Sequence, residues 1–181
     1  MMRICANFNA DSALISLYFA YVRSHLEYAA IVLSPNYDVY LNRIESVQKK
    51  FFSFVFKKFG YYSIIKLAPY LFKCSLLNIE QFSDRSNNSK LLFIFDPLTG
   101  RIDSSKILSL LDINVPVRQL RNHSFFRLNM CRTNYAALEP VFSMMSLFND
   151  MYYLFEFEQS RDIFKKKIRR IFFQRLSESV E

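Results

Sequence analysis

The chain has 181 residues, of which 51% are hydrophobic, and carries a net charge of +8. Its 20 Phe and 11 Tyr argue against global disorder and suffice for the core of one domain with an extension. The only glycines, Gly60 and Gly100, are too far apart to form a P-loop or a dinucleotide-binding loop, which excludes those nucleotide-binding enzymes. The cysteines, Cys5, Cys74 and Cys131, are also scattered, which favours a reducing compartment and disfavours a zinc site.

The first 60 residues predict an antiparallel helical hairpin. Ser12 is a suitable N-cap for a helix that extends to about Leu33, where Ser34-Pro35 ends it. A second helix is expected from about Val39 to Lys58, followed by Gly60 as its stop signal. Its expected core stripe has three- and four-residue steps and consists of Tyr40, Ile44, Val47, Phe51 and Val55. Glu45 and Lys49 are spaced as an i,i+4 ion pair on this helix.

Residues 61–181 are expected to form a helical C-terminal extension. Helical segments are predicted at Tyr62–Asn78 and Ser86–Leu98, and Pro140 is placed to open another. Residues 113–138 have no sustained helical period and predict a basic region of extended chain and loops. The predicted fold class is therefore mainly α.

A terminal helix is predicted at residues 160–176, with basic residues around an apolar side. That side is expected to consist of Ile163, Phe164, Ile168, Ile171, Phe172 and Leu176. The favoured interpretation is that it docks on the core, although such a helix could also lie on an anionic membrane surface.

An apolar stretch from Ala13 to Leu33 has the length of a membrane span. It contains Arg23, His25 and Glu27 near its centre, where ionised groups are costly in a bilayer. We therefore expect no integral membrane segment. With no secretory signal recognised at the start, an intracellular location, nuclear or cytoplasmic, is expected.

Positive charge is concentrated in three segments. Arg43–Lys58 has five basic residues and one acid, Ile113–Leu138 has four arginines and no acid, and Arg161–Arg175 has seven basic residues and one acid. Such clusters, next to aromatic residues, are typical of surfaces that bind nucleic-acid phosphates. Arg43, Lys50 and Lys57 recur every seven residues and so project from nearly one face of the predicted helix. The alternative is that these are ordinary solvated helix faces.

The sequence contains no recognisable catalytic centre. Metal-dependent phosphoryl transfer needs carboxylates that converge on cations, and the aspartates here have no aspartate neighbours. No GxSxG or HExxH motif is present. We expect no enzymatic activity of the chain alone and no cofactor.

Several stretches together resemble the C-terminal region of non-LTR retrotransposon reverse transcriptases, particularly the jockey-like elements. The first group consists of Leu17–Ala30 (LYFAYVRSHLEYAA), Ser34-Pro35 and Asn42–Phe51 (NRIESVQKKF). The second consists of Gly100–Asp103, Asn114–Pro116, Arg118, Leu120-Arg121 and Arg132–Tyr135. The order is collinear from about Leu17 to Arg170, which makes the resemblance more specific than any one motif.

The resemblance implies a thumb-like helical region and a post-thumb extension of an RNA-directed DNA polymerase. By this analogy the chain binds RNA or an RNA–DNA duplex without sequence preference and in a salt-sensitive manner. The implied contact residues are Arg43, Lys49, Lys50, Lys57, Arg118, Arg121 and Arg132. The catalytic palm would lie before residue 1, and it is an expected partner. The alternative is a structural or interaction module, or a decayed transposon product without independent function.

Overall fold

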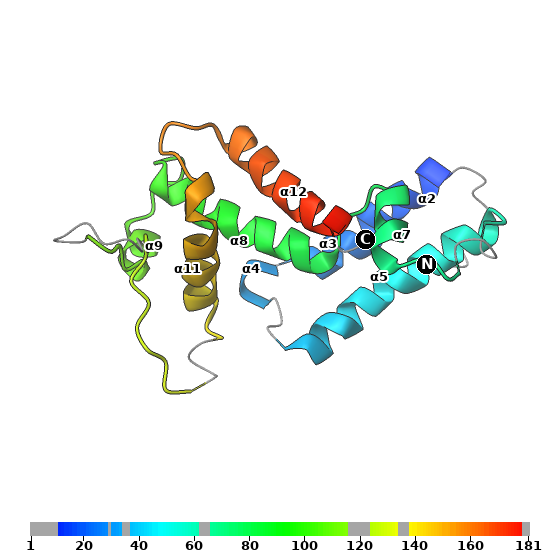
Figure 1. Ribbon diagram of the computed structural model, residues 1–181, viewed down its shortest axis with the longest axis horizontal. Helices are drawn as coiled ribbons and strands as arrows, with labels where there is room; N and C mark the ends of the chain where they lie inside the picture. The colour runs from blue at the N-terminus through cyan, green and yellow to red at the C-terminus, as the bar shows by residue number, and fades with distance from the viewer. Residues whose placement is uncertain are drawn as a thin grey trace. The chain divides into compact units, whose positions relative to one another are not determined.

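The computed structural model describes residues 11–28, 30–33, 37–61, 66–115, 124–133 and 138–178 (Figure 1). Most of these residues are helical, so the prediction of a mainly α protein is confirmed. The chain divides into two compact units, Met1–Ser86 and Asn87–Glu181. Helix α8 (Phe82–Leu98) begins in the first unit and continues in the second. Within the described ranges, no helix has both the length and the hydrophobicity to cross a bilayer.

The first unit begins with a helix that changes its winding. Helix α2 (Asp11–Tyr18) continues into the π-helical turn η1 (Phe19–Arg23) and then α3 (Ser24–Glu27). At Tyr28 the backbone becomes extended, with ψ at 124°, before the short α4 (Ala30–Leu33). The sequence predicted one uninterrupted helix here. No glycine or proline marks the break at Tyr28, so the usual stop signals could not reveal it.

The π-helical turn changes which side chains share a face. In an uninterrupted α-helix Tyr18 and Glu27 would lie on opposite sides, because each residue turns the helix by about 100°. A π-helical turn contains one more residue than an α-helical turn, and here the N–H of Ser24 donates to the carbonyl of Phe19. The extra residue rotates Glu27 toward the side of Tyr18. Glu27 accepts a hydrogen bond from Arg85, and Tyr18 donates one to Gln48, which itself accepts from Arg85.

Helix α5 (Asp38–Lys58) supplies most of the core of the first unit. Phe51 and Val55 are buried as predicted, and the Phe51 ring stacks on Tyr18 with the ring centroids 4.2 Å apart. The prediction that Tyr40 and Val47 belong to the core stripe is wrong, because both are exposed. Two polar residues occupy the buried positions instead, as described below. Gly60, at φ 78°, ends the helix as predicted.

The segment after α5 folds back onto the same core. Of the predicted helix Tyr62–Asn78, only α7 (Tyr70–Leu76) is helical, and residues 62–65 lie outside the described residues. Pro69 precedes α7 and disfavours helical geometry at Ala68, which delays the start of the helix. Asn78 adopts a left-handed conformation, with φ 51°, as the residue after the helix end. This turn places Ile79 in the core.

In the second unit, α8 ends in a Schellman motif. The N–H of Arg101 donates to the carbonyl of Asp96 and that of Gly100 to the carbonyl of Pro97. Gly100 has φ 70°, which explains the glycine at this position. The next elements are α9 (Ser105–Leu110), α11 (Pro140–Met151), the short 3-10 helix η2 (Tyr152–Leu154) and α12 (Arg161–Glu178). Pro140 occupies the first turn of α11, as the sequence predicted.

Phenylalanine rings form the core of the second unit. Phe95 of α8 stacks on Phe164 of α12, with centroids 4.6 Å apart and planes 17° from parallel. Phe155 contacts Phe95 edge to face at 5.8 Å, and Phe148 contacts Phe155 at 5.2 Å. These rings join α8 to α11 and α12, which lie more than 40 residues further along the chain.

The described parts of residues 113–138 contain no helix, in agreement with the expected extended and loop structure. Ile113 and Phe126 form an isolated antiparallel bridge. The Asn149 side chain of α11 then accepts a hydrogen bond from the Phe126 N–H at 2.8 Å and donates one to its carbonyl at 2.9 Å. One side-chain amide therefore fastens this irregular segment to a helix.

The apolar side of α12 docks within the second unit, as the favoured interpretation predicted. Phe164, Ile168 and Phe172 are buried. Ile163 was placed on this side wrongly, because it is 50% exposed and lies well around the helix from Ile168. The Leu176 side chain lies outside the described residues. Since the Phe164 ring is stacked on Phe95, this face is occupied by the protein itself.

Candidate nucleic-acid interface

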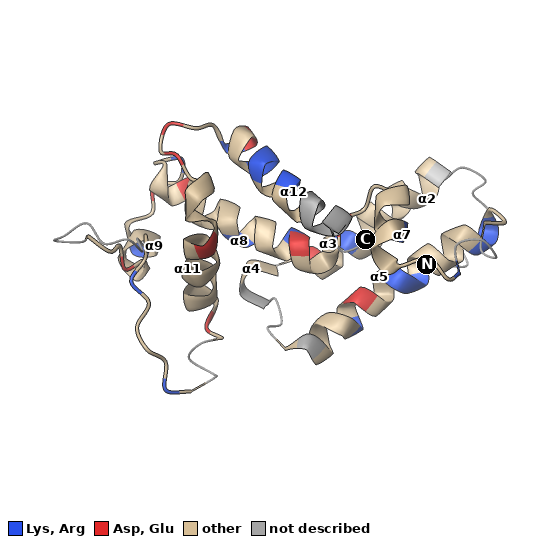
Figure 2. Ribbon diagram, viewed as in Figure 1, with Lys and Arg blue, Asp and Glu red and all other residues tan. Residues whose placement is uncertain are grey.

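Helix α5 has a solvent-facing side that carries the predicted cations. Arg43, Lys50 and Lys57 are all exposed, as is Lys49. Positions seven residues apart differ by only about 20° around an α-helix, so Arg43, Lys50 and Lys57 form a row. Figure 2 shows the basic positions distributed along α5. Four of the seven residues predicted to bind nucleic acid are therefore on one helix.

A shallow hollow of about 480 Å³ lies along this helix. Its described lining consists of Ser46, Lys49, Lys50, Ser53, Phe54 and Lys57. The three ammonium groups provide charge and hydrogen-bond donors for an anionic ligand, and the Phe54 ring adds an apolar surface. The two hydroxyls donate to backbone carbonyls of α5 itself. The structure thus brings Lys49, Lys50 and Lys57 together around one concave surface.

Two of the cations also pack over tyrosine rings. The ammonium nitrogen of Lys49 lies 4.8 Å from the ring centroid of Tyr70. The guanidinium carbon of Arg43 lies 5.9 Å from the ring centroid of Tyr40. These contacts restrict the side chains without neutralising their charge.

The buried side of α5 explains why the cations face solvent. Glu45 and Gln48, one turn apart, are almost completely buried, in line with Phe52 and Val55. The Glu45 carboxylate accepts a hydrogen bond from the Tyr70 hydroxyl and another, at 2.7 Å, from the backbone N–H of Phe82. The predicted partner of Glu45, Lys49, instead packs over the Tyr70 ring.

Gln48 connects α5 to three other segments. Its side-chain oxygen accepts hydrogen bonds from the Tyr18 hydroxyl and from the Arg85 guanidinium, both at 3.0 Å. Its nitrogen donates to the backbone carbonyl of Glu80 at 3.1 Å. Both ends of the amide are therefore satisfied in the interior, which fixes the rotation of α5 about its axis.

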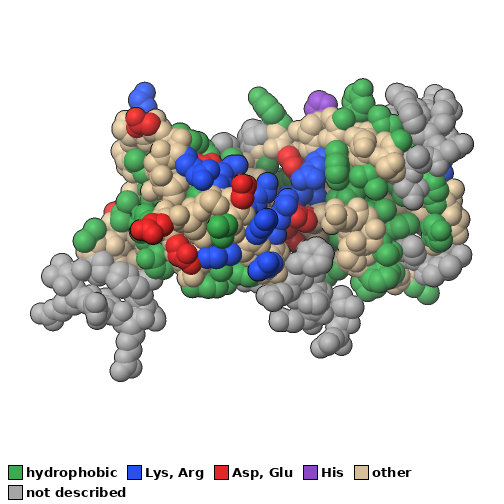
Figure 3. All heavy atoms as spheres, turned by 90° about the horizontal axis from the view of Figure 1, so that it is seen from above, with side chains coloured by type: hydrophobic (Ala, Val, Ile, Leu, Met, Phe, Trp, Pro, Cys, Tyr) green, Lys and Arg blue, Asp and Glu red, His purple; other side chains and the backbone are tan. Residues whose placement is uncertain are grey.

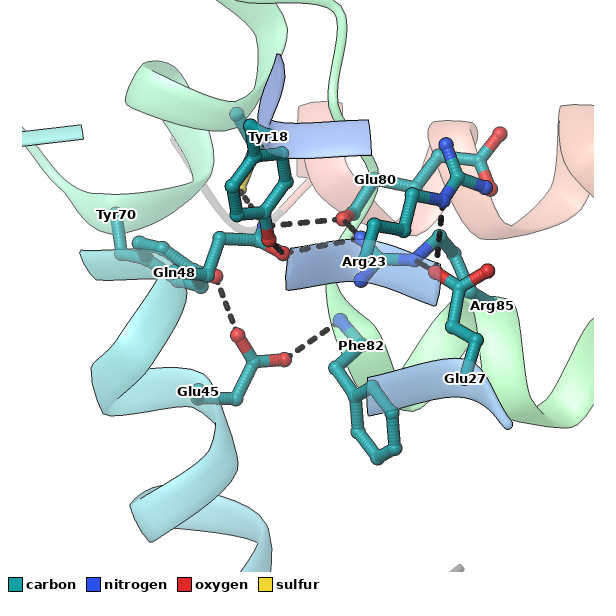
Figure 4. Close-up of polar contacts among 10 residues, drawn as sticks. Tyr18, Arg23, Glu27, Glu45, Gln48, Tyr70, Glu80, Phe82 and Arg85 are labelled. Carbon is teal, nitrogen blue, oxygen red and sulfur yellow. Dashed lines mark hydrogen bonds and ion pairs between the residues drawn. The ribbon is translucent and has the colours of Figure 1, made fainter. Parts of the chain in front are cut away.

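Arg85 is the central residue of this network. It is buried and donates to Glu27, to Gln48 and to the carbonyl of Glu80 (Figure 4). The same Glu27 oxygen also accepts from Arg23 at 2.8 Å. Figure 4 shows side chains from α3, α5 and α8 meeting around these groups. A buried guanidinium needs such partners, since an unpaired one would be very costly.

Burial alters the titration of groups next to the network. It raises the pKa of Cys74 to about 11. Burial is also the main cause of the raised pKa of Tyr70, to which the hydrogen bond with Glu45 adds. The pKa of Tyr18 is raised by burial, against the opposing effect of Arg85. These groups stay protonated at neutral pH. The Tyr18 and Tyr70 hydroxyls donate hydrogen bonds to Gln48 and Glu45, and the Cys74 sulfur accepts one from Gln48.

Sequence reasoning missed this network because it treated polar residues as exposed. A usable signal was present: Glu45, Gln48, Phe52 and Val55 follow the three- and four-residue steps of a buried stripe. Reading that stripe would have placed Tyr40 and Val47 on the outer face.

The three predicted arginines outside α5 form no described group with it. Arg118 and Arg121 lie outside the described residues, and Arg132 is exposed in the non-helical stretch of the second unit.

The cations of α12 are partly neutralised by acids of the second unit. Arg161 pairs with Asp96 at 2.9 Å, and Lys167 pairs with Glu156 at 2.7 Å. In the space-filling view, acidic side chains lie beside several lysine and arginine side chains (Figure 3). This mixture of signs makes α12 a weaker candidate for phosphate binding than the outer face of α5.

Among the described residues, no group of three or more His, Cys, Asp or Glu side chains could hold a metal ion. The outer face of α5 is an exposed basic surface, oriented by the polar network beneath it. No family model matches the chain, and no curated protein or solved structure matches it.

Proposed function

We propose that this chain binds the phosphate backbone of RNA or of an RNA–DNA duplex through the outer face of α5. The observation that carries the proposal is the row of Arg43, Lys50 and Lys57 beside a hollow that Lys49 also lines. Neutralising phosphates releases condensed counterions, which supplies affinity without sequence preference. The row extends over 14 residues, or about 21 Å, which is the length of several nucleotides along one strand.

The resemblance of Leu17–Ala30 and Asn42–Phe51 to non-LTR retrotransposon reverse transcriptases gives this binding a context. In this proposal α2–α3 and α5 are the thumb-like hairpin of an RNA-directed DNA polymerase, and the remainder is its C-terminal extension. The stacking of Tyr18 on Phe51 supports a close pairing of these two helical segments. The chain would bind the nucleic acid without catalysing a reaction, and a polymerase palm would be its partner.

The proposal is tested by fluorescence anisotropy with a labelled RNA–DNA hybrid over a range of salt concentrations. Binding should weaken steeply as salt rises. The double variant Lys50→Gln, Lys57→Gln should lower the slope of log K against log salt by about 2, one unit for each lost phosphate contact. A matched control is Lys106→Gln, an exposed lysine of α9, which should leave the slope unchanged. Absence of binding at low salt, or binding that is insensitive to salt, would contradict the proposal.

A second candidate function is that of a structural or interaction module. It is favoured by large apolar side chains that are exposed on both units, including Leu67, Val115 and Met130, the last fully exposed. Such side chains can mark a protein partner's contact surface. Light scattering distinguishes the two candidates: self-association would support this function, whereas a monodisperse monomer would count against it.

A further inference from the structure

The N-terminal end of α5 and its N-cap residue present two aromatic rings to solvent. Tyr37 is 56% exposed and Tyr40 is 53% exposed. Their ring centroids are 6.3 Å apart, with the planes at 76°. The Arg43 guanidinium, three residues further on, lies over the Tyr40 ring. Three planar groups therefore follow one another at three-residue steps on the surface.

These rings have no evident role in the core. The buried side of α5 contains Glu45, Gln48 and Phe52, which lie around the helix from Tyr40. Single exposed hydrophobic residues are ordinary on protein surfaces. Here, however, two rings touch each other and a cation covers one of them, at the end of the row that continues to Lys50.

We propose that Tyr37, Tyr40 and Arg43 form a stacking platform for the unpaired bases of a single-stranded nucleic acid. This inference rests on the proposed function, and it adds that the bases as well as the phosphates are contacted. Every base has a π-face, so exposed aromatic rings and guanidinium planes bind single strands with little sequence preference. In a duplex these faces are stacked on neighbouring bases and are hidden from the platform.

The distance between the platform and the lysines matches the length of a short stretch of one nucleic-acid strand. Tyr40 and Lys50 are ten residues apart on α5, a distance of about 15 Å along the helix axis. An extended strand of a few nucleotides covers that length, with bases over the tyrosines and phosphates continuing toward Lys50 and Lys57. This combination of rings and cations selects a single-stranded end or gap of the nucleic acid, next to the part whose phosphates the lysines bind.

The test compares two fluorescein-labelled single strands of about 12 nucleotides, within the range that single-strand-binding surfaces cover. One is of mixed sequence, and in the other every base is replaced by an abasic site. The full chain should bind the strand with bases about tenfold more tightly. The double variant Tyr37→Ala, Tyr40→Ala should lose this preference and retain its affinity for the abasic strand.

Two controls separate stacking from other effects. Tyr37→Phe, Tyr40→Phe keeps both rings and should keep the preference, while Tyr153→Ala removes an exposed tyrosine of the second unit and should change nothing. Circular dichroism should show unchanged helix content in all variants, because the rings are on the surface. Equal binding of both strands by the unaltered chain would overturn the platform and leave phosphate binding intact. Failure to bind either strand at low salt would overturn the platform, and the RNA–DNA hybrid measured under the same conditions decides whether the proposed function fails as well.

Discussion

The two units hold their helices together by different means. In the first unit, a carboxylate, an amide and a guanidinium from Glu45, Gln48 and Arg85 join α5 and α8 to the neighbouring segments. In the second unit, stacked and edge-on phenylalanine rings join α8, α11 and α12. Apolar packing scales with buried area and has few directional demands. A buried polar network needs every partner in place, so it fixes one orientation of each helix more strictly.

This difference bears on the candidate interface. The outer face of α5 is defined by what its inner face binds, because both ends of the Gln48 amide and both oxygens of Glu45 have partners in the interior. Rotation of α5 by even one residue would break these bonds. The row of Arg43, Lys50 and Lys57 is consequently held toward solvent by polar bonding rather than by the fit of apolar side chains.

The largest effect is expected in the aromatic core. Phe164→Ala should lower the free energy of unfolding by about 4 kcal/mol, because it removes a fully buried ring and leaves a cavity next to Phe95. Urea unfolding followed by circular dichroism measures the change. Ile163→Ala, at the exposed neighbouring position, is the control and should cost less than about 1 kcal/mol. Equal losses for the two variants would show that α12 does not pack as described.

A somewhat smaller loss is expected for the polar network. Arg85→Met keeps much of the side-chain volume but leaves Glu27, Gln48 and the Glu80 carbonyl without their guanidinium partner. The free energy of unfolding should fall by about 3 kcal/mol, since the remaining buried polar groups lose their hydrogen bonds. The same urea experiment measures it.

Arg23 offers a matched control for this variant, because it binds the same Glu27 oxygen from a more exposed position. Arg23→Met should cost at most about 1 kcal/mol, as is usual for ion pairs near the surface. A loss for Arg85→Met as small as that for Arg23→Met would mean that the network contributes little. The two units would then differ only in the kinds of side chain in their interiors, and not in how strictly those side chains orient the helices.

Much of the helical framework could be predicted from the sequence. Gly60, Gly100 and Pro140 act at helix ends as their conformational preferences dictate. The burial of Phe164, Ile168 and Phe172 follows from the apolar spacing of α12, whereas Ile163 is exposed and Ile171 only partly buried. The π-helical turn and the break at Tyr28 could not be predicted in this way. They accompany the ion pair between Glu27 and Arg85, a contact between residues that are distant in sequence.

The basic residues of the candidate interface were predicted from the sequence, but the buried polar network that orients them was not. The seven-residue spacing of Arg43, Lys50 and Lys57 is a local property of one helix, so the sequence contains it fully. Glu45 was assigned to Lys49 because local pairing rules recognise only neighbours on the same helix. Its actual partners, Tyr70 and the N–H of Phe82, are brought to it by tertiary folding. Tyr37 and Tyr40 were overlooked as surface groups because hydrophobic periodicity counted Tyr40 as core.

The smallest predicted effect is a change in the free energy of unfolding with pH, and the sign of this change differs between the two units. Burial raises the pKa of Cys74 to about 11 from its ordinary value of 9.0, so the unfolded chain loses this proton at a lower pH than the folded chain does. The stability contributed by the protonated thiol is therefore complete below pH 9.0 and is lost as pH rises toward about 11, with a decline of about 1 kcal/mol near pH 10.

Lys90 of the second unit affects stability in the opposite direction. Burial lowers its pKa below 10.5, so rising pH removes the cost of its buried charge. Urea unfolding at several pH values should show a shallower alkaline decline for Cys74→Ala and a steeper one for Lys90→Met, each relative to the unaltered chain. Identical slopes for all three proteins would show that neither Cys74 nor Lys90 titrates differently on folding.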